Sequence, residues 1–432
     1  MLTDIRRIMS AALCTVLSAA MLCSCTSGSS EKTETAETAQ AEQTTDSADS
    51  KEISQEASDD VSFPEIILPA PETEQVQTTL PDTTETAAPQ APAEPRLYGA
   101  SELSQYSVGR TLLQDDVLYF NHSCSGLRFD FCGTSLKAEL VSSAEYCYDE
   151  LHRAWVAVYL DDSIEPYCRF PLDSERATYQ LFESEQPVEA QITIVKLTEQ
   201  QFGTAGITSL EAGVGDTLDI VPLTDGYIEF FGDSITAGYG NEGELSHGFD
   251  TSEENGYLTY ASIAARELGV DYSMICVSGM GLTDSRTCDY VASDIYPKTD
   301  VFLSDEEYSF SRKPQLVVVN LGANDSYYIN LDDSYYELYE NRYYELLAQI
   351  RQKNPDAVIL CCICDYWQSR LPQIERAIER FSAETGDDKI HSLLLPYVTK
   401  EEDYGSDAHP KICVQYEIAD VLIGKIKELG AF

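Results

Sequence analysis

Serine, asparagine and histidine each follow an apolar run at separate places in the C-terminal half of the chain. Ser234 stands in "IEFFGDSITAGYG", Asn324 in "NLGANDS" and His409 in "GSDAHP". A serine hydroxyl is a weak nucleophile at neutral pH, so it needs a base within reach and donors for the charge that develops on the carbonyl oxygen. These residue types indicate acyl transfer, with Ser234 as nucleophile and His409 as general base. The alternative is that Gly-Asp-Ser only forms a turn, which these residue types favour.

Position singles out His409 among the five histidines of the chain. It follows the last apolar run, and Pro410 disfavours helix at the residue before it. We therefore expect its imidazole on a stiff loop that faces the end of the first strand. The other four histidines, for which a structural role is the simpler interpretation, are His122, His152, His247 and His391.

Donors for an oxyanion are expected from three segments. We predict the backbone N–H groups of Ser234 and Gly281 and the side-chain amide of Asn324. One such donor typically stabilises a transition state by about 3 kcal/mol. Gly279, in the same "SGMGLTDS" segment as Gly281, is the alternative backbone donor.

A parallel sheet is the scaffold that would bring these segments together. From residue 226 to 432, apolar runs such as "PQLVVVNLG" and "AVILCCICDYW" alternate with helical patterns such as "YLTYASIAARELG". Runs rich in Val, Ile and Cys predict strands that helices cover on both faces. Ligands of such sheets bind beyond the carboxyl ends of the strands. Ser234, Asn324 and His409 follow such ends in chain order, so we expect them to converge.

The preceding segment, residues 96–222, has a different pattern. Short alternating runs such as "GLRFDFCG", "RAWVAVYLDDS" and "AQITIVKLT" are separated by Gly, Asp and Ser. This spacing predicts an antiparallel β-sandwich. The alternative is a set of hairpins that decorate the α/β domain.

The first 95 residues have the composition of export and tether segments. Residues 1–25 combine Arg6 and Arg7 with an apolar run and the ending "LCSC", which resembles a bacterial lipobox with Cys25 as the lipidated residue. The alternative is an ordinary secretory signal that is cleaved near the same place. Residues 26–95 contain sixteen acidic residues and two lysines, which predicts a disordered, Thr- and Pro-rich tether.

Overall composition narrows the range of partners. The length of 432 residues allows two domains and a tail, and the formal charge of −46 argues against nucleic acid or an anionic membrane surface as a partner. No Cys/His spacing fits a zinc site, and the sequence implies no metal or organic cofactor. Ten cysteines follow Cys25, and an exported protein could pair some of them, although the sequence does not give the connectivity.

The blocks "GDS", "SGMGLTDS", "GAND" and "SDAH" resemble those of the SGNH (GDSL-type) hydrolase superfamily. Upstream, "YSVGR", "SGLRFDFCGTSL" and "ITIVKLTEQQFG" resemble the N-terminal jelly-roll of carbohydrate esterase family 2, in which a sandwich precedes an SGNH domain. The resemblance implies a flavodoxin-like C-terminal sheet and an exported deacetylase of plant polysaccharides such as xylan or mannan. It also favours Gly281 over Gly279, because Thr283 and Asp284 follow Gly281 as in the family block.

Two positions depart from the resembled pattern. Many superfamily members place an acid three residues before the histidine, where this chain has Ser406. Asp407 would share a face with His409 in an extended segment and so could orient the imidazole, or it could face solvent and leave a Ser-His dyad with a backbone carbonyl. Ala408 stands where family 2 often has a tryptophan. Aromatic residues that could replace it in a sugar subsite, or could only pack, are Tyr239, Tyr327, Tyr328 and Trp367.

We therefore predict a lipid-anchored serine esterase that removes O-acetyl groups from a polysaccharide through an acyl-enzyme. A first alternative keeps the chemistry and changes the substrate to another acyl compound, such as a lipid or thioester. A second alternative is an inactive carbohydrate-binding surface lipoprotein. Asp233 and Asp325 are expected to secure their loops by local hydrogen bonds, without a direct chemical role.

Overall fold

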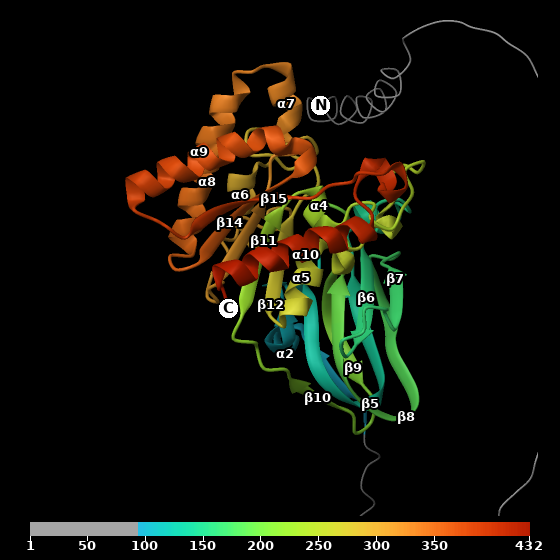
Figure 1. Cartoon of the computed structure of the whole chain (residues 1–432). Coiled ribbons are helices and arrows are strands. Elements are labelled where there is room, and N and C mark those ends of the chain that lie inside the picture. Colours follow the sequence, from blue (N-terminus) through green and yellow to red (C-terminus); the bar gives the residue numbers. More distant parts are fainter. Residues whose placement is uncertain (1–93) are drawn as a thin grey trace, which may run out of the picture. The chain divides into compact units, whose positions relative to one another are not determined.

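The structure, a computed structural model, describes residues 94–432. The expected signal peptide, Cys25 and nearly all of the expected tether lie outside the described residues. Figure 1 shows a β-rich region, followed along the chain by a region in which strands and helices alternate.

Every neighbouring pair of strands in the C-terminal sheet is parallel, as the sequence predicted. The strand order is β12-β11-β13-β14-β15. The chain passes from β11 to β12 on one side and then returns to β13 on the other, so the switch point lies between β11 and β13, where α/β sheets bind ligands. The strands are β11 (Tyr227–Gly232), β12 (Asp271–Cys276), β13 (Leu316–Asn320), β14 (Val358–Cys364) and β15 (Ile390–Leu395).

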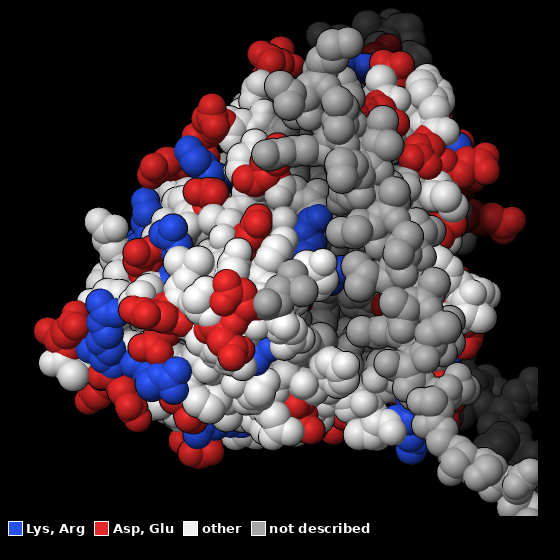
Figure 2. Space-filling model, turned by 90° about the horizontal axis from the view of Figure 1, so that it is seen from above, with Lys and Arg blue, Asp and Glu red and all other residues white. Residues whose placement is uncertain are grey.

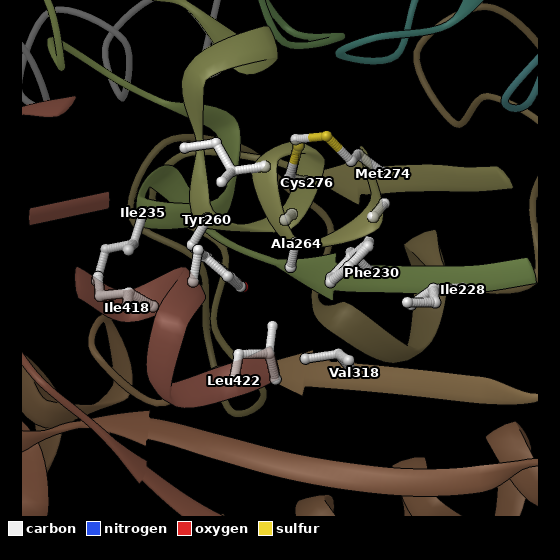
Figure 3. Packing of buried hydrophobic residues seen from close by; sticks show 14 of the residues in the cluster. Ile228, Phe230, Ile235, Tyr260, Ala264, Met274, Cys276, Val318, Ile418 and Leu422 are labelled. Atoms are coloured by element: carbon white, nitrogen blue, oxygen red, sulfur yellow. The ribbon is translucent and has the colours of Figure 1, made fainter. Parts of the chain in front are cut away.

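Helices cover both faces of this sheet because successive strand side chains point to opposite sides. Phe230 packs with α5 and α10 in one cluster, whereas Phe231 packs with α6, α8 and α9 in another. Figure 3 shows the first cluster, in which strand residues meet Ala264 of α5 and Leu422 of α10. The helices are α4 (Ser234–Ala237), α5 (Tyr260–Leu268), α6 (Ala292–Ile295), α7 (Asp325–Leu331), α8 (Tyr335–Lys353), α9 (Leu371–Thr385) and α10 (Ile412–Leu429).

The N-terminal region is antiparallel throughout. Its strands follow the path β3-β4-β9-β5-β8-β6-β7, with β1 beside β9 and with β2 and β10 beside β5. The expected β-rich domain is therefore present, and its strands form one hydrogen-bonded network. The strands are β1 (Arg96–Gly99), β2 (Ser107–Val108), β3 (Leu112–Gln114), β4 (Val117–Tyr119), β5 (Gly126–Val141), β6 (Trp155–Leu160), β7 (Cys168–Pro171), β8 (Arg176–Lys196), β9 (Gly206–Ala212) and β10 (Thr217–Ile220), with short helices α2 (Ala100–Leu103) and α3 (Ala144–Cys147).

A buried ion pair joins the β-rich region to the parallel sheet. Arg110, between β2 and β3, donates to Glu229 Oε1 on β11 at 2.9 Å and to the carbonyl oxygens of Tyr296 and Lys298 at 2.7 and 2.8 Å. The Tyr296 hydroxyl donates to the second oxygen of Glu229 at 2.7 Å. Because both charges are fully buried, removal of either one would leave the other without a partner.

The cysteines of residues 94–432 are all free. Cys361, Cys362 and Cys364 of β14 are buried and pack as small apolar residues, as the pattern of this strand predicted. Within the same residues, every helix is too short or too polar to cross a membrane.

Candidate active site

Ser234 lies where β11 passes into α4. The carboxylate of Asp233 caps α4 by accepting from the N–H of Ile235 at 3.2 Å. Gly232 is required at the strand end, because a Cβ there would lie 2.0 Å from Thr236 Oγ1. These local contacts hold the Ser234 side chain at the carboxyl edge of the sheet, with 9% of the residue exposed.

His409 meets Ser234 across a sequence separation of 175 residues. Its Nε2 lies 2.9 Å from Ser234 Oγ. The residue is only partly buried, but the loss of water around its ring lowers the pKa of His409 to about 4, and the nearby Asp407 carboxylate opposes this shift. The imidazole is therefore neutral at pH 7, and Nε2 can accept the serine proton.

Asp407 does not make the expected hydrogen bond to His409. Its carboxylate accepts from the Tyr239 hydroxyl at 3.2 Å, and no side chain among residues 94–432 binds Nδ1 of His409, although the backbone of Ser406 and of Asp407 acts to raise the histidine pKa. The expectation assumed an extended segment, but Asp407 and Ala408 have φ values of 48° and 59°. In this left-handed conformation, side chains two residues apart no longer share a face. A direct orienting role for Asp407 remains a prediction.

The expected oxyanion donors lie close together, but two of them already have acceptors. The N–H of Gly281 donates to Ser285 Oγ at 3.2 Å. Both hydrogens of the Asn324 amide have acceptors, with Met280 O at 2.9 Å and Asp233 Oδ2 at 3.3 Å. These contacts give Asn324 a clear structural role, and a catalytic role would require one of them to be exchanged for substrate.

Gly279 offers a backbone donor without such competition. Within residues 94–432, no acceptor engages the N–H of Gly279 or that of Ser234. Gly279 has a φ of 79°, and a Cβ there would lie 2.5 Å from Thr287 Oγ1, so glycine is needed at this position. The N–H of Gly279 can take a new acceptor without losing another, whereas that of Gly281 would have to leave Ser285 Oγ, and the choice of Gly281 as the second backbone donor stays a prediction.

Two buried aspartates shape the loops around Ser234. Asp325 accepts from the N–H groups of Leu282 and Thr283 and from the Thr283 hydroxyl, which ties the loop after β12 to the start of α7. Asp233 caps α4 and also accepts from Asn324. Burial raises the pKa of Asp325, and it raises that of Asp233 to about 7. Asp325 thus secures a distant loop, whereas only a local role was expected.

Aromatic side chains surround the histidine. The Tyr239 ring lies 4.5 Å from the His409 imidazole and stacks on Phe249 at 3.6 Å. The Tyr397 hydroxyl donates to the Ala408 carbonyl at 3.2 Å and thus holds the left-handed loop. The other aromatic candidates for a sugar subsite contact other rings. Tyr327 packs against Tyr328, and Trp367 packs against Tyr366, of which 65% is exposed.

The four other histidines have partners or positions away from Ser234. His122 is buried, and its Nε2 lies 2.7 Å from the Thr299 carbonyl oxygen. His152 and His247 pair with Asp149 and Glu253, and His391 lies on β15. Among residues 94–432, no group of three His, Cys, Asp or Glu side chains is arranged to hold a metal ion.

One contact to the site was missed from the sequence. Glu199, in the β-rich region, accepts from the N–H of Ser278 at 2.6 Å, next to Gly279. The segment "ITIVKLTEQQFG" contains this glutamate. No local pattern indicates that its side chain reaches a loop 79 residues further along the chain.

Comparison with known families agrees with this geometry. Residues 230–410 match the GDSL-like Lipase/Acylhydrolase family, and residues 107–222 match the Carbohydrate esterase 2 N-terminal family. The chain thus contains a GDSL/SGNH lipase-acylhydrolase domain and a carbohydrate esterase 2 N-terminal domain. The carbohydrate esterase 2 N-terminal match precedes the GDSL-like match along the chain.

Curated relatives of this chain include proteins named as esterases. The Cellulase/esterase CelE of Acetivibrio thermocellus is 29% identical over 317 residues, which are 71% of this chain and 37% of that protein. An Acetylxylan esterase / glucomannan deacetylase of Cellvibrio japonicus is 25% identical over 224 residues, which are 50% of this chain and 60% of that protein. The chain thus spans less than two thirds of the length of either curated relative.

Solved structures show the same fold. A family two carbohydrate esterase from Clostridium thermocellum, in complex with cellohexaose, has a TM-score of 0.65 and 28% identity, covering 76% of this chain and 99% of that one. An acetyl xylan esterase from the rumen bacterium Butyrivibrio proteoclasticus has a TM-score of 0.69 and 20% identity, covering 78% of this chain and 100% of that one.

Proposed function

We propose that this SGNH hydrolase is an exported carboxylic ester hydrolase that removes O-acetyl groups from polysaccharides of the xylan or mannan type. The observation that carries the proposal is the 2.9 Å contact between His409 Nε2 and Ser234 Oγ at the carboxyl edge of the sheet. The family 2 N-terminal domain and the acetylxylan esterase relatives support a carbohydrate ester as the substrate.

The proposed reaction proceeds in two acyl-transfer steps. Ser234 Oγ attacks the acetyl carbonyl carbon while His409 Nε2 takes the hydroxyl proton. The N–H groups of Ser234 and Gly279 stabilise the negative oxygen, with Gly281 and Asn324 as the further predicted donors. The sugar oxygen leaves with the proton from His409, and the acetyl group stays on Ser234. Water then attacks the acetyl-enzyme, His409 takes its proton, and acetate leaves as Ser234 Oγ regains a proton.

Surface charge is consistent with an uncharged polymer as substrate. The chain has a formal charge of −46. On the part of the face in Figure 2 that described residues form, basic side chains are interspersed with acidic ones. Because the net charge is strongly negative, long-range repulsion would oppose the approach of a polyanion but not of a neutral acetylated glycan.

Acetate release is the direct test of this proposal. The purified protein and its Ser234→Ala variant are incubated with acetylated xylan, acetylated mannan and an aryl acetate. We expect the wild type to release acetate and the variant to release none. Turnover of the aryl acetate alone would favour a different acyl substrate. Glycan binding without turnover of any ester would favour the inactive binding lipoprotein and refute the esterase.

We further propose that the protein is anchored to the outer face of a bacterial membrane through lipidated Cys25. The support is the "LCSC" sequence after a basic and apolar start, together with the acidic segment that follows. These residues lie outside the described part of the chain. Cys25→Ser is expected to move the protein from the membrane to the soluble fraction, and an unmodified mature N-terminus downstream of Cys25 would refute the anchor.

A further inference from the structure

Two side chains of the β-rich region hold the loop that follows β12. Glu199 Oε2 accepts from the N–H of Ser278 at 2.6 Å. Gln201 Nε2 donates to the carbonyl oxygen of the same serine at 3.0 Å. Both polar groups of the Ser278 backbone are therefore bound by residues that come from outside the α/β domain.

These contacts determine the direction of the Gly279 N–H. The peptide bond between Ser278 and Gly279 is planar and trans, so its C=O and its N–H point in opposite directions. Gln201 Nε2 and Thr287 Oγ1 both donate to the Ser278 carbonyl oxygen, which fixes the orientation of the plane. A rotation of this plane would redirect the Gly279 N–H and move a donor away from the oxyanion position.

Glu199 is itself fixed on both sides of its backbone. Its N–H donates to Glu254 Oε1 at 2.9 Å, and its carbonyl oxygen accepts from Lys196 Nζ at 2.8 Å. Lys196 also donates to carbonyl oxygens of Asn121 and Gly203 at 3.0 and 2.6 Å. Glu199, Lys196 and Glu254 are fully buried. Because buried polar groups are costly without partners, these contacts hold the segment in one arrangement.

The groups around Glu199 make this residue easier to ionise than its buried neighbour Glu254. Burial raises the pKa of both Glu199 and Glu254. The Ser278 N–H, Gln201 and Lys196 then act to lower the pKa of Glu199, whereas the Glu199 carboxylate raises that of Glu254 further. Glu254 therefore keeps its proton to higher pH than Glu199 does. The Ser278 N–H donates to Glu199, the more ionised of the two carboxyl groups, and this charge strengthens the hydrogen bond.

We propose that Glu199 is a positioning residue of the esterase site, which helps to align the Gly279 N–H by fixing the Val277–Ser278 peptide, while Gln201 and Thr287 hold the Ser278–Gly279 peptide. The inference rests on the proposed function, because it takes Gly279 as an oxyanion donor. It gives the N-terminal region an indirect role in the reaction, because Glu199 contacts neither Ser234 nor His409 and acts through the loop that contains Gly279.

The test compares Glu199→Ala, Glu199→Gln and Glu189→Ala with the wild type on an aryl acetate. Glu199→Ala removes the carboxylate and is expected to lower kcat about 100-fold, with KM changed less than about twofold. Small displacements of a catalytic group have effects of this size. Glutamine can still accept from the Ser278 N–H, so Glu199→Gln is expected to lose only about tenfold, as a neutral acceptor is weaker. Glu189 is exposed on β8, the strand that ends at Lys196 before Glu199, and its variant should match the wild type.

Hydrogen exchange of the peptide that contains Ser278 provides a readout independent of activity. Glu199→Ala should exchange faster there than the wild type, and Glu189→Ala should not. A wild-type kcat in Glu199→Ala, or a loss that lies only in KM, would overturn the proposal. If Glu199→Ala does not fold, the same criteria apply to Glu199→Gln. If the wild type and Ser234→Ala are equally inactive, the proposed function fails, and unchanged exchange in the Glu199 variants would separately refute the contact.

Discussion

The hydroxyl of Tyr239 donates to the carboxylate of Asp407 at 3.2 Å, while no side chain among residues 94–432 binds Nδ1 of His409. The same tyrosine lies against the imidazole, with ring centres 4.5 Å apart. Asp407 thus acts on His409 through its charge, which raises the histidine pKa against the larger effect of burial. The geometry therefore pairs Ser234 with His409 and leaves the Asp407 carboxylate without a hydrogen bond to the imidazole.

We expect Asp407→Asn to lower the single-turnover rate on an aryl acetate by less than about tenfold, because loss of a triad acid costs about 10,000-fold only where the acid binds the imidazole. The asparagine oxygen can still accept from Tyr239, so the loop should keep its shape. His409→Ala should abolish turnover. A loss of a thousandfold or more in Asp407→Asn would show that the carboxylate reaches Nδ1 during the reaction.

Gly279→Ala is expected to lower kcat about 100-fold, because the new Cβ would lie 2.5 Å from Thr287 Oγ1 and displace the adjacent N–H. Gly269→Ala is the matched control. Gly269 is also left-handed, with a φ of 66°, but a Cβ there meets nothing within 4 Å. It should cost about 1 kcal/mol of stability and leave kcat unchanged. Equal kcat values for the two variants would exclude Gly279 as a donor.

Arg110→Met is expected to destabilise the protein by about 3–5 kcal/mol, because it leaves the Glu229 carboxylate buried without its cationic partner. The double variant Arg110→Met/Glu229→Gln should recover part of this loss. Urea unfolding measures both effects. Arg376→Met, which breaks a half-exposed ion pair with Glu340, should change stability much less. A similar loss in Arg110→Met and Arg376→Met would contradict the structural role of the buried pair.

The sheet and the meeting of Ser234 with His409 could be predicted because both follow from chain order. Alternating strand and helix patterns specify a parallel sheet, and polar residues after successive strands must share one edge. The detailed contacts of the site could not be predicted from the sequence. The left-handed conformation of Asp407 and Ala408 has no local signal, because neither residue is glycine. The contact between Glu199 and Ser278 joins residues 79 positions apart and depends on tertiary packing, which residue spacing does not encode.

The pH dependence of acetate release should report the burial of His409. The base must be neutral to accept the serine proton, and burial lowers its pKa to about 4 from an ordinary value of about 6.5. The rate should therefore be constant from about pH 5 upward as far as His409 determines it, and should fall as pH decreases through 4. An exposed histidine would place this fall near pH 6.5.

Protonation of His409 also affects folding stability, which decreases as pH falls. Between about pH 6.5 and 4, the unfolded chain binds a proton at this histidine and the folded chain does not, so the contribution of His409 to folding stability decreases as pH falls through this range. The kinetic measurement therefore needs circular dichroism at each pH, to show that the protein is still folded where the rate declines. A rate that halves near pH 6.5 in folded protein would mean that solvent reaches the imidazole, and would contradict the buried base.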